Sequence, residues 1–335
     1  YGDHRDLHRL IRRQRQMCIR DRKYTSFVPS AVWKSEPDIS LFDHSKITCA
    51  IAECLHKNVD EIYLNNIIAA MNKIFHNDKL TEDEKSSLNE DKFLLIGGDV
   101  SGVQKFIYSI TSKGAAKALK GRSFYLQLLS DAIAKYILKE LGLSVANLLY
   151  SAGGHFYILA PVNSNLDKVY ENIERVLMEI HNGELHLVTA ETPVKAVDFI
   201  GENFVKKWDE VGKKLGEAKK KKFSRILEKE VFYPKEEFRG VCKSCGMPTK
   251  YELIRGEEVE KCRLCKSFEE LTEKIARRGK IKARYIIETI PTGNEKEGTW
   301  EWNISKFATK YELSLIHISE PTRPLYISYA VFCLK

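Results

Sequence analysis

The alternation of strand and helix patterns between residues 93 and 192 most constrains what this chain can fold into. It begins with a short apolar run and includes a long amphipathic helix whose apolar stripe contains Leu126, Ile133 and Ile137. The segments indicated are strands at 93–96, 146–150, 155–160 and 184–192, and helices at 103–110, 123–141 and 166–181. This β-α-β-β-α-β order predicts an α+β fold of the ferredoxin-like kind. Palm domains of polymerases and nucleotide cyclases share that core, but a fold alone does not define a function.

Helical patterns flank this core on both sides. Apolar residues recur at helical spacing over 43–56, behind Asp43 or Ser45 as a possible cap, and a second helix is expected over 62–75. The polar stretch 76–92 reads as a linker. Downstream, the chain is expected to be helical and lysine-rich over 199–229, helical again over 268–278, and extended over 283–290.

Both ends of the chain carry peptides that share one DNA source. Residues 16–22 read QMCIRDR and residues 313–318 read LSLIHI. Codons for MCIRDR on one strand give LSLIHI on the complementary strand, so one short element in two orientations explains both. It resembles a sequencing-library adapter, and such segments are excluded from fold reasoning. We therefore expect 1–22 and 313–335 to be non-native and the chain to be an internal fragment.

Removing these ends weakens the argument from charge. They carry +4 and +1 of the formal net charge of +8, which leaves +3 for the remainder. Global basicity is therefore a poor indicator of a nucleic-acid partner, and local clusters must carry that argument. An apolar content of 43% favours a globular protein, and no apolar run approaches the ~20 residues of a membrane span. The cysteine usage suits a reducing cytosol, so a cytoplasmic protein without membrane contact is expected.

Four cysteines form the strongest local signal. Cys242, Cys245, Cys262 and Cys265 follow the pattern C-x₂-C-x₁₆-C-x₂-C. Two pairs at this spacing predict a tetrahedral Zn²⁺ site, and four thiolates leave no open position for catalysis. A redox dithiol pair is the alternative. The zinc is expected to brace the fold, although zinc knuckles also contact nucleic acid.

The stretch FLLIGGDVSG at 93–102 raises the question of a catalytic carboxylate. Asp99 is expected to end the first strand, where palm enzymes place a ligand for the ions that hold a nucleotide triphosphate. The second carboxylate normally lies in the following hairpin, but Gly154 and His155 stand there. No Asp-Asp pair occurs in the chain. We therefore interpret 97–100 as a strand-to-helix junction in a palm whose metal site is half dismantled, with no catalytic residue.

Several polar residues near this junction have two interpretations. Ser101 and Gly102 open a helix whose N–H groups could bind phosphate, or they form only a cap and a tight turn. Lys117, Lys120 and Arg122 form a basic turn that is either solvated or contacts phosphates of RNA or ATP. His155 is read as a structural strand residue. The lysines at 219–222 are read as a solvated face, with contact to RNA or a small subunit as the alternative.

Three longer motifs carry a resemblance to a known family. They are GGDVSGVQKFIYSI, GAAKALKGRSFYLQLLSDAIA and LLYSAGGHFYILAP. All three resemble the first palm domain of the large subunit of type III-A (Csm) CRISPR effector complexes. The segment VPSAVWKSEPDISLFDHSKITCAIAECL resembles the end of that subunit's HD domain, and the four-cysteine module falls at the family's zinc-bearing insertion. The resemblance implies an HD remnant at 23–80, a linker at 81–92, a palm domain lacking GGDD at 93–200 and a zinc-bearing helical domain at 201–312.

The resemblance also implies an antiviral function. The family's large subunit binds guide RNA and target RNA with other Csm subunits, cleaves single-stranded DNA with its HD domain, and condenses ATP into cyclic oligoadenylates with Mg²⁺ or another divalent metal. The catalytic GGDD of the second palm and the HD metal pair are absent here, and Asp43-His44 does not replace that pair. The fragment is expected to be inactive alone and to supply one wall of the ATP site, with Asp99, Ser101 and Gly102 near phosphate or metal.

Two rivals stay open. The first is a stand-alone, non-catalytic palm and zinc module that binds RNA. The second is a self-sufficient nucleotide cyclase with a single palm, which the missing hairpin carboxylates disfavour because two-metal chemistry needs both ligand sets.

Overall fold

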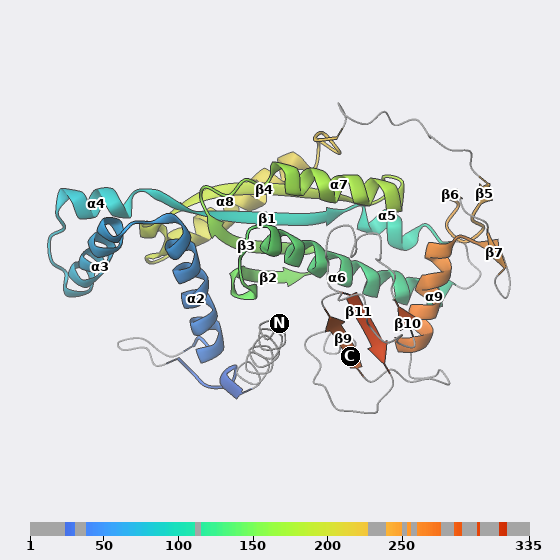
Figure 1. Cartoon of the computed structure of the whole chain (residues 1–335), viewed down its shortest axis with the longest axis horizontal. Coiled ribbons are helices and arrows are strands. Elements are labelled where there is room, and N and C mark those ends of the chain that lie inside the picture. The colour runs from blue at the N-terminus through green and yellow to red at the C-terminus, as the bar shows by residue number, and fades with distance from the viewer. Residues whose placement is uncertain are drawn as a thin grey trace, which may run out of the picture.

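A four-stranded antiparallel sheet forms the centre of the chain (Figure 1). The computed structural model describes residues 24–30, 38–110, 115–226, 239–249, 253–255, 260–275, 285–289, 300–301 and 315–319. The strands are β1 (Asp91–Ser101), β2 (Leu148–Ala152), β3 (His155–Pro161) and β4 (His186–Lys195), and they lie in the order β2-β3-β1-β4. The intervening helices are α5 (Val103–Tyr108), α6 (Ala115–Glu140) and α7 (Asp167–His181). This is the β-α-β-β-α-β order that the sequence predicts.

Alternate residues of β1 enter two different cores, one on each face of the sheet. Leu94 and Ile96 pack with residues of α6 and α7. Phe93 and Leu95 pack on the opposite face with residues of α2 (Leu41–Asn58) and α8 (Asn203–Ala218). Because side chains alternate along a strand, two separate apolar layers follow directly from the apolar run of β1. Helices α2 and α8 therefore share one core with the sheet.

Two of the helices before the sheet begin at residues that the sequence analysis did not identify as caps. Helix α2 is capped by Ser40, whose Oγ accepts a hydrogen bond from the Asp43 N–H, so the predicted caps Asp43 and Ser45 are wrong. Helix α3 (Glu61–His76) confirms the predicted one. Within the predicted linker, Thr81 and Glu84 form a reciprocal capping box that begins α4 (Glu82–Leu88).

Three further elements have different bounds from those predicted. Strand β1 continues through Ser101, well past residue 96. Helix α6 begins at Ala115, so the predicted basic turn before it is the first part of the helix. Helix α8 ends at Ala218, and the lysines at 219–222 follow in turns.

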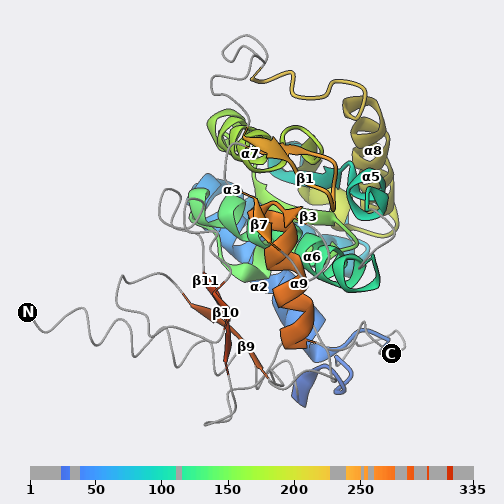
Figure 2. The ribbon, with the colours of Figure 1, turned by 90° about the vertical axis from the view of Figure 1, so that its right-hand side faces the viewer.

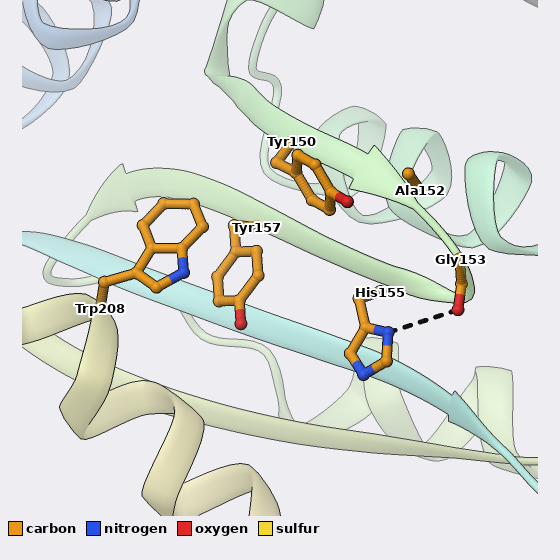
Figure 3. A pocket seen from close by; sticks show the side chains of 6 residues that line it. All are labelled: Tyr150, Ala152, Gly153, His155, Tyr157 and Trp208. Atoms are coloured by element: carbon orange, nitrogen blue, oxygen red, sulfur yellow. Dashed lines mark hydrogen bonds between the residues drawn. The ribbon is translucent and has the colours of Figure 1, made fainter. Parts of the chain in front are cut away.

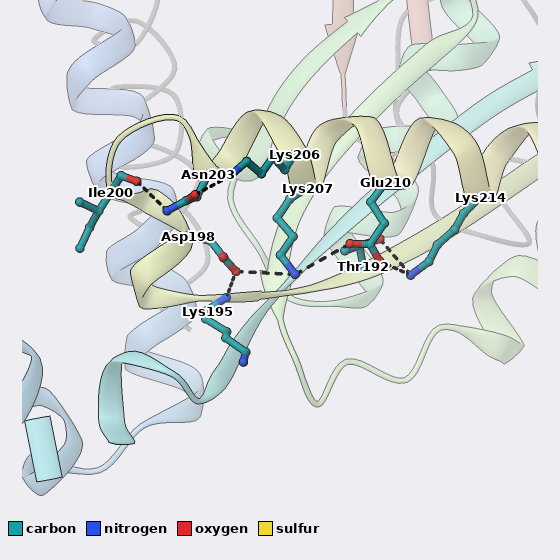
Figure 4. A network of polar contacts seen from close by, with 9 residues as sticks. All are labelled: Thr192, Lys195, Asp198, Ile200, Asn203, Lys206, Lys207, Glu210 and Lys214. Carbon is teal, nitrogen blue, oxygen red and sulfur yellow. Dashed lines mark hydrogen bonds and ion pairs between the residues drawn. The ribbon is translucent and has the colours of Figure 1, made fainter. Parts of the chain in front are cut away.

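Two of the lysines on α8 anchor the helix to the sheet and to the connection after β4 (Figure 4). The Lys214 Nζ donates to the Glu191 carbonyl at 3.0 Å and to the Thr192 hydroxyl at 3.1 Å. The Lys207 Nζ lies 3.7 Å from a carboxylate oxygen of Asp198, in η2 (Ala196–Phe199). This part of the lysine-rich segment is thus a packing surface, and only its remainder is a solvated face.

The remaining elements of the described chain are α9 and several short segments. They are η1 (Val145–Asn147), β5 (Gly240–Val241), β6 (Pro248–Thr249), β7 (Ile254–Arg255), β8 (Glu260–Lys261), α9 (Arg263–Ile275), β9 (Tyr285–Thr289), β10 (Trp300–Glu301) and β11 (Leu315–Ser319). Helix α9 packs against α6 (Figure 2), and its residues Phe268 and Leu271 belong to the core that also contains residues of α6. Strand β11 pairs with β9 and β10 and lies within the stretch 313–335 that the sequence marks as adapter-derived. None of the described helices has the length and apolarity to cross a membrane.

Burial of His181 is expected to make the stability of the fold depend on pH. The Nε2 of His181, at the end of α7, lies 2.7 Å from the hydroxyl of Tyr125. Burial, reinforced by the charge of Arg122, lowers the pKa of His181 from its ordinary 6.5 to about 3. Between these values the unfolded chain binds a proton that the folded chain does not bind. The free energy of unfolding is therefore expected to fall by about 1.4 kcal/mol per pH unit from this group as the pH drops below 6.5.

Urea unfolding between pH 7 and pH 4 tests this expectation. The variant His181→Asn should lose part of the slope, whereas the same change at the exposed His76 should leave the slope intact. Equal slopes for all three proteins would show that His181 is not the source.

Candidate functional site

The two glycines of the GGD stretch lie inside β1 and serve close packing. A Cβ on Gly97 would stand 2.5 Å from the Cγ1 of Val211 on α8. A Cβ on Gly98 would stand 2.0 Å from the ring of Phe156, its neighbour across the strand pair. The interpretation of 97–100 as a strand-to-helix junction is therefore wrong. These glycines let a helix and an aromatic ring rest directly on the backbone of the strand.

Asp99 is buried in β1, and both of its carboxylate oxygens have nitrogen partners. Its Oδ1 lies 3.1 Å from the Nε2 of His155, which faces it across the sheet, and its Oδ2 lies 2.8 Å from the Nζ of Lys219. The other ring nitrogen of His155 lies 3.3 Å from the Gly153 carbonyl. A carboxylate held in this way is an ion-pair partner and not an open metal ligand.

An aromatic pocket of about 430 Å³ lies beside this ion-pair group (Figure 3). Its lining residues are Tyr150, Ala152, Gly153, His155, Tyr157 and Trp208. Tyr157 and Trp208 stack with ring centroids 4.0 Å apart, and Tyr150 is 49% exposed. Burial, assisted by the negative charge of Asp99, raises the pKa of Tyr157, so its hydroxyl stays neutral. Aromatic side chains can stack on a planar base, and a cation beside them can bind a negatively charged group attached to that base.

Ser101 and Gly102 occupy the end of β1 and the start of α5. Gly102 is the N-cap residue, with φ of 94°, and α5 has no side-chain cap. The capping role considered for Ser101 is therefore wrong. A Cβ on Gly102 would also stand 2.0 Å from the carbonyl oxygen of Glu184, so glycine is required here for two reasons. Helix α5 has only 6 residues, which makes its N-terminus a weak phosphate site.

The three predicted phosphate contacts separate into different environments. Lys120 is exposed on α6. Arg122 is only 1% exposed, and its guanidinium donates to the Phe106 carbonyl and to the Sγ of Cys265. The predicted contact of Arg122 with RNA or ATP is therefore wrong, because its charged group lies inside the protein. Lys117 belongs to α6, but its side chain lies outside the described part of the chain.

The four cysteines converge as predicted. Their Sγ atoms all lie within 4.8 Å of one another, and those of Cys245 and Cys262 are 4.0 Å apart. Four thiolates around Zn²⁺ at 2.3 Å would stand about 3.8 Å apart, so the cluster fits a tetrahedral ion. Cys242 and Cys265 are buried.

The acid–base chemistry of the cluster also favours a cation. Hydrogen bonds from Cys245, Cys262 and Cys265 to the Cys242 thiolate lower the pKa of Cys242. The same hydrogen bonds raise the pKa values of the three donors. The thiols by themselves thus favour a single thiolate, and four thiolates together require a bound cation.

The sequence missed three residues of the pocket and of the adjacent Asp99 ion pair. Lys219 was read as part of a solvated run, and Trp208 was not singled out. His155 was judged structural, yet it contacts Asp99 and lines the pocket. Strand register could have paired Asp99 with His155, whereas nothing local places Lys219 or Trp208 there.

The comparisons with known proteins agree with this description. Residues 92–237 match the family described as Csm1 subunit domain B. Over 234 residues the chain is 41% identical to the single-strand-specific deoxyribonuclease Cas10/Csm1 (subtype III-A) of Methanocaldococcus jannaschii. The aligned region covers 62% of this chain and 28% of the Methanocaldococcus protein. The chain is 35% identical over 206 residues to the Cas10/Csm1 protein of Enterococcus italicus, covering 59% of this chain and 26% of that protein.

Solved structures give the same result. A crystal structure of a Csm1–Csm4 cassette in complex with AMPPNP matches 63% of this chain and 27% of its own, with a TM-score of 0.50 and 31% identity. A second cassette, in complex with one ATP, matches 92% of this chain and 34% of its own, with a TM-score of 0.57 and 24% identity, which supports the fold alone.

Over part of its length the chain is thus similar to the large subunit of type III-A CRISPR systems. The chain is a partial match to the Cas10/Csm1 subunit, and it spans about a quarter of the length of the curated relatives it matches. Its residues 92–237 correspond to Csm1 subunit domain B.

Proposed function

We propose that this chain is the non-catalytic palm region of a type III-A effector large subunit acting in antiviral defence. The whole subunit would bind guide and target RNA with other Csm subunits, convert ATP to cyclic oligoadenylates and cleave single-stranded DNA. This region would supply one wall of the ATP site and a structural zinc module. The curated relatives are named as single-strand-specific deoxyribonucleases, and a similar cassette was crystallised with AMPPNP.

One observation carries the ATP-wall proposal: the aromatic pocket lies beside the Asp99–Lys219 ion pair at the β2–β3 hairpin. Tyr150 and Tyr157 offer aromatic surface for adenine, and Lys219 offers a cation for phosphate. When bound, Mg²⁺ would stabilise the charge on the α-phosphate as a 3′-hydroxyl attacks it. Asp99 would approach that ion, and the Mg²⁺ would then replace Lys219 as the partner of its carboxylate. The Cys242–Cys265 cluster would hold Zn²⁺ as a brace.

Removing an exposed aromatic wall is expected to weaken ATP binding. The variant Tyr150→Ala should lower the affinity for AMPPNP by about 5- to 150-fold, since stacking on a base contributes about 1–3 kcal/mol. Tyr108→Ala, which also truncates an exposed tyrosine but away from the pocket, is the control and should change nothing. Calorimetric titration of the whole chain measures both. Equal affinities would remove the pocket from the ATP site.

The chain alone is also expected to make no cyclic oligoadenylate from ATP and Mg²⁺. His155 and Lys219 occupy the positions around Asp99 at which a second carboxylate would be needed. Product formation by the purified chain would contradict the non-catalytic assignment and favour the single-palm cyclase.

The exposed lysines after α8 distinguish the RNA-binding alternative. Lys219 pairs with Asp99, and the Lys222 Nζ donates to the Gly183 carbonyl, so both have internal partners. We expect Lys220→Glu with Lys221→Glu to leave the affinity for single-stranded RNA unchanged. Each lost phosphate contact would instead flatten the plot of log affinity against log salt by about 0.7. A flatter plot would favour the stand-alone RNA-binding module.

A further inference from the structure

Arg122 is a fully buried cation that forms no ion pair with a carboxylate of the described residues. It lies on α6 with 1% of its surface exposed. Among the described residues, no Asp or Glu oxygen lies within ion-pair distance of its guanidinium, and its Nε has no hydrogen-bond partner. Burial raises the pKa of Glu184, and the positive charge of Arg122 opposes that rise without a direct ion pair between the two side chains. Because a buried charge needs a counter-charge, the environment of Arg122 must supply an anion of another kind.

A cysteine sulfur of the four-cysteine cluster is in position to supply that negative charge once it is ionised. The Arg122 Nη2 lies 3.5 Å from the Sγ of Cys265, which is itself buried. The Nη1 on the other arm donates to the carbonyl of Phe106 and lies 3.3 Å from the Oγ of Ser109, the C-cap residue of α5. The rings of Phe106 and Phe268 flank the guanidinium at 5.0 and 5.9 Å. The side chain therefore spans from the cluster to the end of α5.

The charges of the loaded cluster match this arrangement. Four thiolates around one Zn²⁺ carry a net charge of −2, which a neighbouring guanidinium offsets in part. A guanidinium that donates to a ligating sulfur also fixes the direction of that ligand, as partners beyond the ligands commonly do in metal sites. Without the ion, a neutral Cys265 thiol would leave Arg122 buried beside aromatic rings and carbonyls alone.

We propose that Arg122 is a positioning residue of the four-cysteine metal centre. Its guanidinium balances and orients the Cys265 thiolate and ties the loaded centre to the end of α5. The inference rests on the proposed zinc binding. Helix α5 follows directly on β1, which contains Asp99, so the metal centre and the nucleotide-facing strand are connected through one side chain. Loading the centre then stabilises the packing of α5 against α6.

The experiment compares variants of Arg122 with a variant of Arg225, a second arginine held by side-chain hydrogen bonds, in the whole chain. Arg122→Gln removes the charge, and Arg122→Lys keeps the charge with a shorter reach. Arg225→Gln is the matched control, because Arg225 also donates to a side chain, Glu174 Oε1 at 2.7 Å, and lies over an aromatic ring, Tyr170 at 4.8 Å. The measurements are Zn²⁺ affinity by chelator competition, the sulfur-to-metal absorption of the Co²⁺-loaded protein, and thermal unfolding with and without metal.

Arg122→Gln is expected to lose about 10- to 100-fold in Zn²⁺ affinity. It should also shift the Co²⁺ absorption to longer wavelength, because a thiolate without its cation gives up an electron more easily. Arg122→Lys should recover part of the Zn²⁺ affinity and part of the absorption shift. Arg225→Gln should have the Zn²⁺ affinity and Co²⁺ absorption of the wild type. Affinity and absorption equal to the wild type in both Arg122 variants would overturn the inference while leaving zinc binding intact. A wild type that binds no zinc would overturn the zinc proposal and this inference together. If Arg122→Gln does not fold, the Arg122→Lys spectrum decides in the same way.

Discussion

Replacing Cys242 with serine is expected to abolish stoichiometric zinc binding and to unfold the cysteine module. Cys242 is buried, and its Sγ is one of the four that lie within 4.8 Å of one another, so a hydroxyl there removes one ligand of the cluster. Binding of structural Zn²⁺ contributes about 10–16 kcal/mol in zinc-finger peptides, and most of that is free energy of folding. The affinity should fall by more than the roughly 100-fold typical of changes beyond the ligands.

Elemental analysis after dialysis and thermal unfolding with and without a chelator measure this effect. Cys49→Ser is the matched control, since Cys49 is an exposed free cysteine outside the cluster. It should retain one zinc per chain and the same chelator sensitivity as the wild type. A zinc-loaded, equally stable Cys242→Ser protein would show that the four cysteines are not a metal site, and the redox alternative would then be the one to examine.

The second large effect is expected at the centre of the sheet. The variant Gly98→Ala places a methyl group 2.0 Å from the ring of Phe156, which is itself fully buried. Neither the strand nor the ring can move away without disturbing its neighbours, so the free energy of unfolding should fall by about 1–3 kcal/mol. Urea unfolding at neutral pH measures the change.

Gly212→Ala provides the control for this variant. Gly212 lies in α8 with no atom within 4 Å of an added Cβ. Alanine there should stabilise the chain by about 0.5–1 kcal/mol, because a helical glycine has more freedom to lose on folding. If Gly98→Ala were as stable as Gly212→Ala, the close approach of Phe156 to β1 would not exist in solution.

The parts of the structure predicted correctly depend on short-range signals. The cysteine spacing brings its own four ligands together, and two glycines between two apolar runs give the β2–β3 hairpin. The extent of β1 was missed because Gly97 and Gly98 are poor strand formers, and only packing by Val211 and Phe156 explains them. Pattern within a segment therefore predicted the elements, while long-range packing decided their ends.

The candidate site follows the same division. Asp99 could be singled out because it follows an apolar run in a recognisable motif. The partners that determine its state, Lys219 and His155, come from distant parts of the chain and are specified by register and by the end of α8. Arg122 was misread for a similar reason, since the sulfur it contacts lies 143 residues away. A basic residue near a glycine gives no local sign of being buried.

The shared core of α2, the sheet and α8 has a practical consequence for recombinant expression. The segment 93–200 looks like a complete palm domain, yet cutting there would strip both helices from one face of the sheet. Leu95, Leu159 and Val188 would then meet water together, and an open apolar sheet face favours association with other copies. Soluble protein should instead require boundaries outside α2 and α8. The smallest segment worth expressing is therefore the one that keeps both apolar faces of the sheet buried.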